Sequence, residues 1–184
     1  ALGKQTYANF EVCVVSELAQ AGLTDYEGIP KFRLVLFNGT AHEQLKAAEK
    51  MLNGAYFLQL LPGDLPAPDA LHMLVLQTHA NPEAEVVFAD EDSVIDGIRQ
   101  NPIFKPDYGR DTLRSFNSIG RPMLVAQRVH AAVGGFRGST PAELWAYCID
   151  CASAAKQVIH IARIGLTVIR SCDGSEIPCT DILK

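Results

Sequence analysis

Positive charge is scarce in this sequence. Sixteen lysine and arginine residues stand against 21 aspartate and glutamate residues, so the formal net charge is −5 and the pI is near 5.5. Proteins that bind nucleic acid neutralise backbone phosphates with many lysine and arginine side chains. We therefore expect no nucleic-acid partner.

Long apolar runs are also lacking. No segment approaches the ~20 apolar residues of a transmembrane helix, and the N-terminus lacks the basic and apolar stretches of a secretory signal. We expect a cytoplasmic protein, with a peripheral position at the inner face of a membrane left open. With 184 residues, 48% hydrophobic and 20% charged, the chain is typical of one globular domain.

The cysteines lack the pattern of a disulfide framework. There are five, an odd number, at positions 13, 148, 151, 172 and 179, which favours a reducing compartment. Cys148 and Cys151 form a single CxxC inside a stretch with helical periodicity. Buried thiols are the favoured interpretation there, with a zinc or redox site as the alternative.

Apolar runs rich in β-branched residues alternate with helical patterns along the chain. This alternation is typical of an α/β fold in which helices connect parallel strands. The pattern predicts strands over residues 10–16, 33–37, 56–61 and 85–89, and helices over residues 41–53 and 68–79.

Acidic residues follow two of these predicted strands. Asp64 comes after the third strand and Asp90, Glu91 and Asp92 come after the fourth. Ligands of open α/β sheets bind at the carboxyl ends of the strands, so these carboxylates are candidate ligand contacts. Aspartate is also common in turns after strands, and spacing does not decide between the two interpretations.

Several segments together resemble the inverting family 2 glycosyltransferases, which have the GT-A fold. QTYANFEVCVV resembles the family's QTYPNFEVVVV, and LLPGDLPAPDAL resembles its metal-binding segment LLDxDDxLxPxAL. The most specific stretch contains FADEDSVID, NPIFKPDYGRDTL, FNSIG and AAVGGFRG, in the order and with the spacing of the family's YxDEDxID, PxFKPDW, NYIG and VGGFR. These segments occupy residues 5–15, 60–71, 88–96, 101–113, 116–120 and 131–138.

The resemblance implies a mostly parallel sheet flanked by helices and a specific reaction. A saccharide or other hydroxyl acceptor would attack a nucleotide-diphospho-sugar, most simply of the UDP type. The departing diphosphate would be neutralised by Mg²⁺ or Mn²⁺ held on carboxylates, and the acceptor hydroxyl would need a general base.

The resemblance also assigns roles to residues of this chain. Arg121 is a further candidate contact for the diphosphate or the acceptor. By position, the others are Ser16, Glu17, Asp173, Asp90 and Asp92 at the donor, Glu91, Lys105 and Arg137 on the acceptor side, Asp64 at the metal and Glu143 as the base.

The sequence departs from the family at the reacting centre. Glu17 is the acidic match to the family's DDGS, Pro62 replaces the first metal carboxylate, and Pro141 stands at the position of the base. Glu143 follows two positions later, about 200° around a helix. The element HIPxxLYHWR is reduced to residues 160–163. A second hypothesis is therefore a catalytically inactive relative that serves as a nucleotide-sugar-binding or assembly module.

The order of segments is unusual as well. Family members begin with a strand and most of a helix before QTYPNFEV, and here residues 165–184 resemble that opening. We expect residues 1–164 to form a GT-A domain that residues 165–184 complete, with strand 166–170 beside residues 10–15. Three explanations of this order are open: a circular permutation, a tandem array cut out of phase and an unusual numbering. If the tail does not reach back within its own chain, it would fill the same place in a neighbouring molecule and give a strand-swapped homo-oligomer. An ordinary final strand is the alternative.

Overall fold

The computed structural model describes residues 1–16, 29 and 31–171 of the chain, so Glu17 and Asp173 lie outside the described residues. The elements, in chain order, are η1 (Leu2–Lys4), β1 (Val12–Ser16), β2 (Phe32–Leu36), α1 (Ala41–Glu49), β3 (Tyr56–Leu58), β4 (Asp64–Pro66), α2 (Ala70–Ala80), β5 (Ala84–Ile95), β6 (Ile98–Ile103), α3 (Arg110–Ser115), β7 (Met123–Ala126), α4 (Gln127–Ala132), α5 (Pro141–Ala154) and β8 (Gln157–Ile169).

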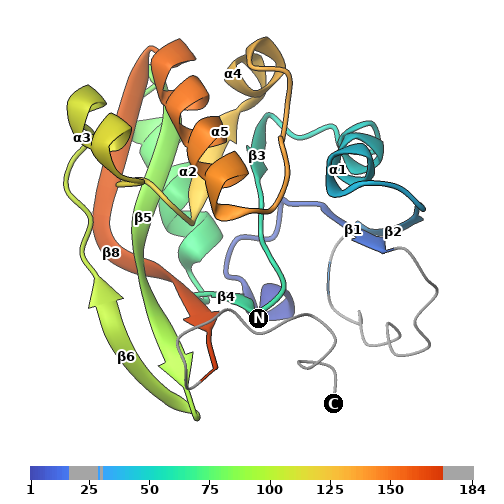
Figure 1. Cartoon of the computed structure of the whole chain (residues 1–184), viewed down its shortest axis with the longest axis horizontal. Coiled ribbons are helices and arrows are strands. Elements are labelled where there is room, and N and C mark those ends of the chain that lie inside the picture. The colour runs from blue at the N-terminus through green and yellow to red at the C-terminus, as the bar shows by residue number, and fades with distance from the viewer. Residues whose placement is uncertain (17–28, 30, 172–184) are drawn as a thin grey trace.

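Two sheets organise these elements (Figure 1). The larger has the order β3-β7-β5-β8-β4, with β6 paired to the second half of β5. In this sheet β5 and β8 are parallel, whereas the pairs β3-β7, β5-β7, β5-β6 and β4-β8 are antiparallel. The α/β class is confirmed, and the described sheet is mixed. The smaller sheet pairs β1 and β2 in parallel.

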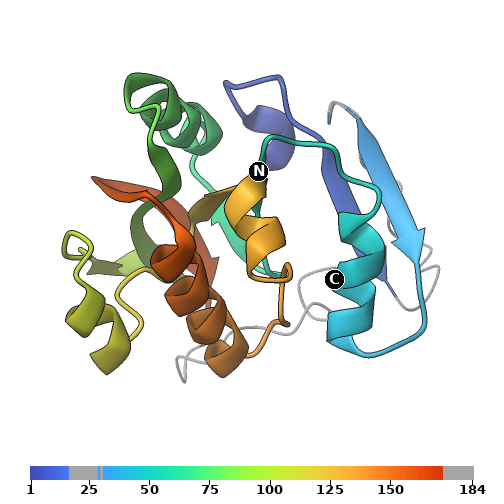
Figure 2. The same ribbon diagram turned by 90° about the horizontal axis from the view of Figure 1, so that it is seen from above.

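The central strand β5 is buried on both faces because its apolar side chains alternate between two layers. Val86 and Phe88 pack in a cluster with α5, and Val87 and Ala89 pack in a second cluster with α2. Figures 1 and 2 show α2 and α5 on opposite faces of the sheet. The sheet therefore forms the middle of a three-layer arrangement.

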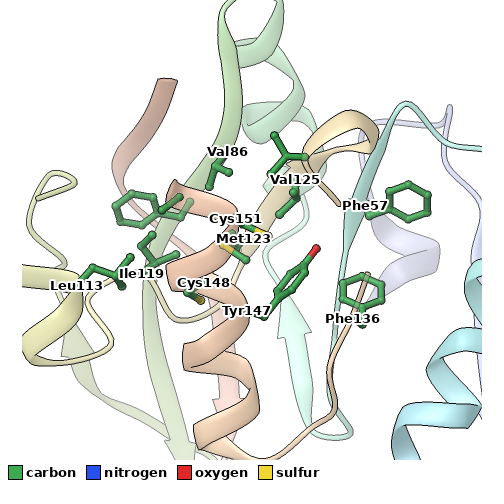
Figure 3. Close-up of a cluster of buried hydrophobic side chains, with 13 residues drawn as sticks. Phe57, Val86, Leu113, Ile119, Met123, Val125, Phe136, Tyr147, Cys148 and Cys151 are labelled. Atoms are coloured by element: carbon green, nitrogen blue, oxygen red, sulfur yellow. The ribbon is translucent and has the colours of Figure 1, made fainter. Parts of the chain in front are cut away.

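Helix α5 begins with a capping box. The Thr140 hydroxyl accepts a hydrogen bond from the Glu143 amide, the Glu143 carboxylate accepts one from the Thr140 amide, and Pro141 opens the helix. The inner face of α5 contributes Tyr147, Cys148 and Cys151 to the core in Figure 3. Cys148 and Cys151 are both buried, which confirms the prediction of buried thiols, and burial raises the pKa of each thiol to about 12.

Strand β5 is longer than the sequence predicts. It continues through Asp90, Glu91 and Asp92 to Ile95, and then returns as β6 through a two-residue turn. Asp96 and Gly97 both have positive φ, of 51° and 77°, as a type I′ hairpin turn requires. The acidic triplet therefore lies inside a strand, and the expectation that it follows the end of a strand is wrong.

Strand β8 corrects a second expectation. Leu166, Thr167 and Val168 pair with β4 on one side, and the segment from Leu166 to Ile169 pairs with β5 on the other. These residues therefore continue β8 in the middle of the larger sheet and do not pair with β1. Residues 172–184 lie outside the described residues, so the proposed permutation and strand swap stay predictions.

None of the helices in the described ranges combines the length and the hydrophobicity that crossing a membrane requires.

Candidate functional site

Asp64, the candidate metal ligand, is the first residue of β4, and its side chain is fully buried. Its Oδ2 accepts a hydrogen bond of 2.8 Å from the Leu61 amide and lies 3.2 Å from Nε of Arg121. A buried carboxylate needs such partners, because burying it without a countercharge is very costly. Asp64 is thus bound to the segment that follows FNSIG.

Arg121 connects Asp64 to the acidic triplet. Its backbone amide donates to Glu91 Oε2 over 3.3 Å, and the same oxygen lies 3.0 Å from Lys105 Nζ. The structure therefore brings Asp64, Glu91 and Lys105 together around Arg121, although they are distant in the sequence. We call these four residues the Arg121 cluster.

Lys105 is the buried anchor of this cluster. Its ammonium donates to the carbonyl oxygens of Ala89 and Arg121 over 2.8 and 2.6 Å, and it pairs with Glu91. Burial lowers the pKa of Lys105, and the Glu91 carboxylate partly offsets this effect. Because an ammonium has three donors, these partners occupy Lys105, which holds the loop after β6 against β5.

Gly120 permits the backbone to pass close to the Glu91–Lys105 pair. Its φ is +54°, and a Cβ at this position would lie 3.2 Å from Glu91 Oε2 and 3.4 Å from Lys105 Nζ. Both the left-handed conformation and the close approach favour glycine. This glycine is the last residue of FNSIG, one of the segments that resemble the family.

Two cavities border on Gly120. The smaller, of about 20 Å³, is lined by Gln59, Arg121, Tyr147 and Cys148 among others, and is large enough for about one water molecule. The larger, of about 200 Å³, is lined by residues of three segments: Glu91 on β5, Phe104 to Pro106 after β6, and Phe116 to Ser118 after α3. The larger cavity lies beside the Arg121 cluster and can admit part of a ligand.

Asp90 has a different environment from its neighbour Glu91. Its Oδ1 accepts a hydrogen bond of 2.9 Å from the Lys105 amide and lies 2.8 Å from His160 Nε2 on β8. The other ring nitrogen of His160 lies 3.3 Å from the exposed carboxylate of Asp107, and the ring stacks on Phe88. Asp90 thereby ties β5 to β8 and to the FKPD segment.

Asp92 pairs with the second strand of the hairpin. Its Oδ2 accepts a hydrogen bond of 2.8 Å from Nε of Arg99 on β6 and forms an ion pair with Nη2 of the same guanidinium over 2.6 Å. Its Oδ1 is buried and has no hydrogen-bond partner among the described residues. Neither Asp90 nor Asp92 lines either cavity, and their donor-binding role stays a prediction.

Glu143 and Arg137 are engaged elsewhere. The Glu143 carboxylate binds the Thr140 hydroxyl and amide at the start of α5, and these hydrogen bonds lower the pKa of Glu143. Arg137 pairs with Asp150 on the same helix, and its carbonyl oxygen contacts His42. Neither residue lines the two cavities, so the base and acceptor roles gain no support from this geometry.

The described residues do not form a metal site of their own. Among them, no group of three or more histidine, cysteine, aspartate and glutamate side chains has the arrangement to hold an ion. One of the two carboxylate oxygens of Asp64, Oδ2, already faces the Arg121 guanidinium. Among the residues predicted to contact the sugar donor, Ser16 is the last residue of β1, in register with Leu36. Glu17 and Asp173 lie outside the described residues.

Sequence reasoning identified Asp64, Glu91 and Lys105 but missed the ring and amide groups of the larger cavity. Phe104, Phe116 and Asn117 belong to the segments NPIFKPDYGRDTL and FNSIG that carried the resemblance. Their position inside those segments was the available signal. What pattern analysis could not supply was that the two segments meet at one cavity.

Comparisons with known proteins gave relatives that are much longer than this chain. No family model matches the sequence. The uncharacterized protein y4gI of Sinorhizobium fredii is 31% identical over 173 residues, which cover 87% of this chain and 19% of that protein. The O-antigen biosynthesis protein RfbC of Myxococcus xanthus is 37% identical over 75 residues, which cover 40% of this chain and 6% of that protein. The chain thus spans less than a fifth of the length of each.

Two solved structures of Staphylococcus aureus TarS share the fold. The structure of TarS 1-349 aligns with a TM-score of 0.73 and 15% identity, over 91% of this chain and 54% of that one. A second TarS structure aligns with a TM-score of 0.70 and 15% identity, over 91% of this chain and 33% of that one. The chain therefore shares the GT-A fold of these structures, with a curled mixed sheet between helices.

Proposed function

We propose that this chain is a glycosyltransferase domain that binds a nucleotide-diphospho-sugar and transfers the sugar to an acceptor hydroxyl. One observation carries the proposal: segments that resemble the family 2 enzymes, separated by up to 57 residues between Asp64 and Arg121, converge on the Arg121 cluster beside a cavity. The GT-A fold and the similarity to an O-antigen biosynthesis protein support it.

The proposed reaction exchanges one bond for another at the anomeric carbon. The acceptor oxygen forms a bond to that carbon as the bond to the diphosphate breaks, with inversion of configuration. The diphosphate leaves with the bonding electron pair, and the hydroxyl proton passes to a base. Arg121 supplies positive charge beside Asp64, where the resemblance places the diphosphate.

A divalent cation remains part of the proposal only if a carboxylate from outside the described residues binds it together with Asp64. Asp64 is one carboxylate, and Mg²⁺ in proteins is usually held by one or two carboxylates together with phosphates and water. Asp173 or Glu17 would have to join it. No step above depends on the metal.

A second function, binding without catalysis, is favoured by a specific observation. Pro141 replaces the family's base, and the nearby Glu143 carboxylate is committed to the capping box of α5. A domain with these features would hold a nucleotide sugar or assemble with other domains without transferring the sugar. The great length of the relatives is compatible with such a module inside a larger protein.

Calorimetric titration distinguishes these functions. The chain is titrated with UDP, UDP-glucose, UDP-N-acetylglucosamine and GDP-mannose, with and without Mn²⁺, and donor hydrolysis is measured in parallel. Binding of a UDP compound with hydrolysis or transfer supports the enzyme, and binding without either supports the silent module. Absence of binding to every nucleotide overturns the enzyme and the nucleotide-sugar-binding module, and leaves only a module that assembles with other domains.

Two variants locate the binding. Asp64→Asn removes the proposed cation ligand and the carboxylate that orients the Arg121 guanidinium, and we expect it to weaken nucleotide binding in the presence of Mn²⁺ about tenfold or more. Asp69→Asn removes a carboxylate paired with Arg163 on the partly exposed surface, and we expect no change. Circular dichroism of both variants establishes that they are folded. Equal nucleotide affinity in the two variants would refute the placement at Asp64.

The proposal also covers the cellular location and the oligomeric state of the protein. Cys13, Cys148 and Cys151 are free thiols, which supports a reducing, cytoplasmic environment. The strand swap was expected for residues 165–184; because Leu166 to Ile169 belong to β8, only residues 172–184 after this strand remain for a strand-swapped homo-oligomer. Light scattering of the chain, with and without these residues, tests it, because a swap requires the larger species to disappear on truncation.

A further inference from the structure

The segment between β6 and α3 has no regular secondary structure. Residues 104–109 follow the last residue of β6 and end where α3 begins at Arg110, and Figure 1 shows this segment passing beside β8. Phe104 to Pro106 line the larger cavity. The contacts that hold the segment to the sheet therefore decide the position of one wall of this cavity.

Two of these contacts involve the buried carboxylate of Asp90. Its Oδ1 accepts a hydrogen bond of 2.9 Å from the Lys105 amide and lies 2.8 Å from Nε2 of His160. Nδ1 of the same ring lies 3.3 Å from Oδ1 of Asp107, and Phe88 stacks on the ring at a centroid distance of 4.8 Å. His160 on β8 thus stands between two carboxylates, one from β5 and one from the segment after β6.

A carboxylate at each ring nitrogen makes the pair of contacts depend on the charge of His160. A neutral imidazole has one N–H donor and one acceptor nitrogen, whereas the imidazolium ion has two donors. Because an ionised carboxylate only accepts, both contacts are hydrogen bonds at the same time only when the ring is charged. Loss of one proton leaves a lone pair facing one of the carboxylates, and that contact opens.

Burial decides which contact opens. The side chain of Asp90 is 2% exposed, whereas that of Asp107 is 96% exposed. Taking the ring N–H away from Asp90 would deprive a buried carboxylate of a donor, which is costly. Asp107 is already in water and loses little when its ion pair breaks. The proton of the neutral ring therefore stays at Nε2, and Asp107 is the partner that is released.

Other charged groups in the neighbourhood are bound elsewhere. Among the described residues, the charged groups that face the ring are Asp90 from β5 and Asp107 from the segment after β6. Lys105 faces Asp90 with its amide, and its ammonium is engaged in the Arg121 cluster. Arg163, on the same strand as His160, pairs with the N-cap residue of α2. The contact with Asp107 therefore depends on the ring itself.

We propose that His160 is a positioning residue, whose charged form latches the segment 104–109 to the sheet and whose neutral form releases Asp107. Histidine side chains exchange their proton between about pH 5 and 8, so the latch is closed at the lower end of this range and opens as the pH rises. Lys105 stays bound to β5 in both states. Movement is thus confined to residues 106–109 and the start of α3. This latch goes beyond the proposed function, because it needs no bound nucleotide.

Nuclear magnetic resonance of the ligand-free chain tests the latch. The ring signals of the five histidines are followed from about pH 5 to 8, and His160→Gln identifies the signal of His160. The amide signals of Tyr108 and Gly109 report on the segment. The indole N–H of Trp145, which donates to the Leu113 carbonyl over 2.7 Å, reports on α3. We expect the two amides to shift with the same midpoint as the ring of His160.

Three variants at carboxylates separate the latch from a general effect of charge. In Asp107→Asn the amide suits either form of the ring, because it both donates and accepts. The midpoint of His160 should fall by about half a pH unit, and the amide shifts that follow it should disappear. Asp107→Glu restores the carboxylate and should recover at least part of both effects. Asp111→Asn removes a carboxylate from the first turn of α3 and should leave the midpoint within about 0.2 pH unit.

The outcomes that overturn the latch do not depend on nucleotide binding. A ring of His160 that keeps one charge between about pH 5 and 8 overturns it, and so do amide shifts of Tyr108 and Gly109 that follow a different midpoint. A midpoint in Asp107→Asn equal to that of the parent chain refutes the contact with Asp107. Failure of every nucleotide to bind overturns the proposed enzyme and nucleotide-binding module and leaves these results unchanged.

Discussion

The ammonium of Lys105 lies 3.0 Å from the carboxylate of Glu91, and only 4% and 14% of these side chains are exposed. The pair is thus withdrawn from water at the centre of the Arg121 cluster. It links β5 to the loop after β6, and the adjacent carbonyls of Ala89 and Arg121 complete the coordination of the ammonium. The shape of the larger cavity depends on this link.

Removing one partner of this pair should destabilise the domain strongly. Lys105→Met leaves the Glu91 carboxylate buried beside uncharged groups, and we expect the free energy of unfolding to fall by about 3 kcal/mol, as for other broken buried pairs. Urea denaturation measures it. The double variant Lys105→Met, Glu91→Leu should recover part of the loss. Additive effects of Lys105→Met and Glu91→Leu would show that the pair is not coupled.

Stability at acidic pH should depend on Glu49. Burial raises the pKa of Glu49, but hydrogen bonds from His130, Lys46 and the Phe136 amide outweigh it and hold the pKa below the ordinary value. The unfolded chain then binds this proton at higher pH than the folded chain does. The contribution of Glu49 is fully present above about pH 4.3 and is lost as the pH falls through the folded pKa.

Glu49→Gln isolates this contribution. The free energy of unfolding, measured against pH from 7 downward, should fall less steeply below about pH 4.3 in the variant than in the parent chain. Glu83→Gln is the matched control, because Glu83 is largely exposed and its distance to Lys156 is 3.7 Å. Parallel pH profiles for Glu49→Gln and the parent chain would contradict the role of Glu49.

The capping box of α5 predicts a stability effect separate from catalysis. Thr140→Ala removes the hydroxyl that accepts from the Glu143 amide, and the free energy of unfolding should fall by about 1 kcal/mol. Glu143→Gln should cost less, because glutamine also fits this position of the box. If sugar transfer is observed, Glu143→Gln should leave its rate nearly unchanged. A rate loss of a hundredfold or more would restore Glu143 as the base.

Close packing at Gly165 should make this position intolerant of a side chain. A Cβ there would clash with Met73 Cε and lie 3.1 Å from Ala89 Cβ and 3.2 Å from Pro122 Cγ. Gly165→Ala should lower the free energy of unfolding by about 1–3 kcal/mol, measured by thermal or urea denaturation. Adding Met73→Leu removes the clashing atom and should recover part of the loss; no recovery would place the strain at Ala89 or Pro122.

The parts of the fold that local patterns predict are those stabilised by apolar periodicity. The alternation of strands and helices, and the buried inner face of α5 with Cys148 and Cys151, were read from the sequence. The second half of β5 was not predicted, because its acidic residues interrupt the run of apolar side chains. The buried carboxylate of Asp90 is paired with His160, 70 residues away, and that of Asp92 with Arg99. The turn signal Asp96-Gly97 was present and would have predicted the hairpin.

The candidate site, like the fold, was predicted only in part from the sequence. The resemblance pointed to Asp64, Glu91 and Lys105, which the structure brings together. The bridge by Arg121 depends on the path of the chain after α3, and the occupation of Glu143 by Thr140 depends on where α5 begins. Both the Arg121 bridge and the contact between Glu143 and Thr140 depend on how the chain is placed in three dimensions. The capping signature Thr140 to Glu143 was available in the sequence, and it already indicated a structural use of that carboxylate.

The hairpin formed by β5 and β6 has a consequence for self-association. All six residues of β6 are exposed, and its outer edge has no partner strand in the described chain, so it could template the addition of a foreign strand. Pro102 interrupts this edge, because proline has no amide hydrogen to offer a neighbour. Pro102 thus acts as a gatekeeper together with Asn101, whose positive φ also breaks the regular strand; a β-branched residue at position 102 would remove one of these two protections against fibre-like stacking.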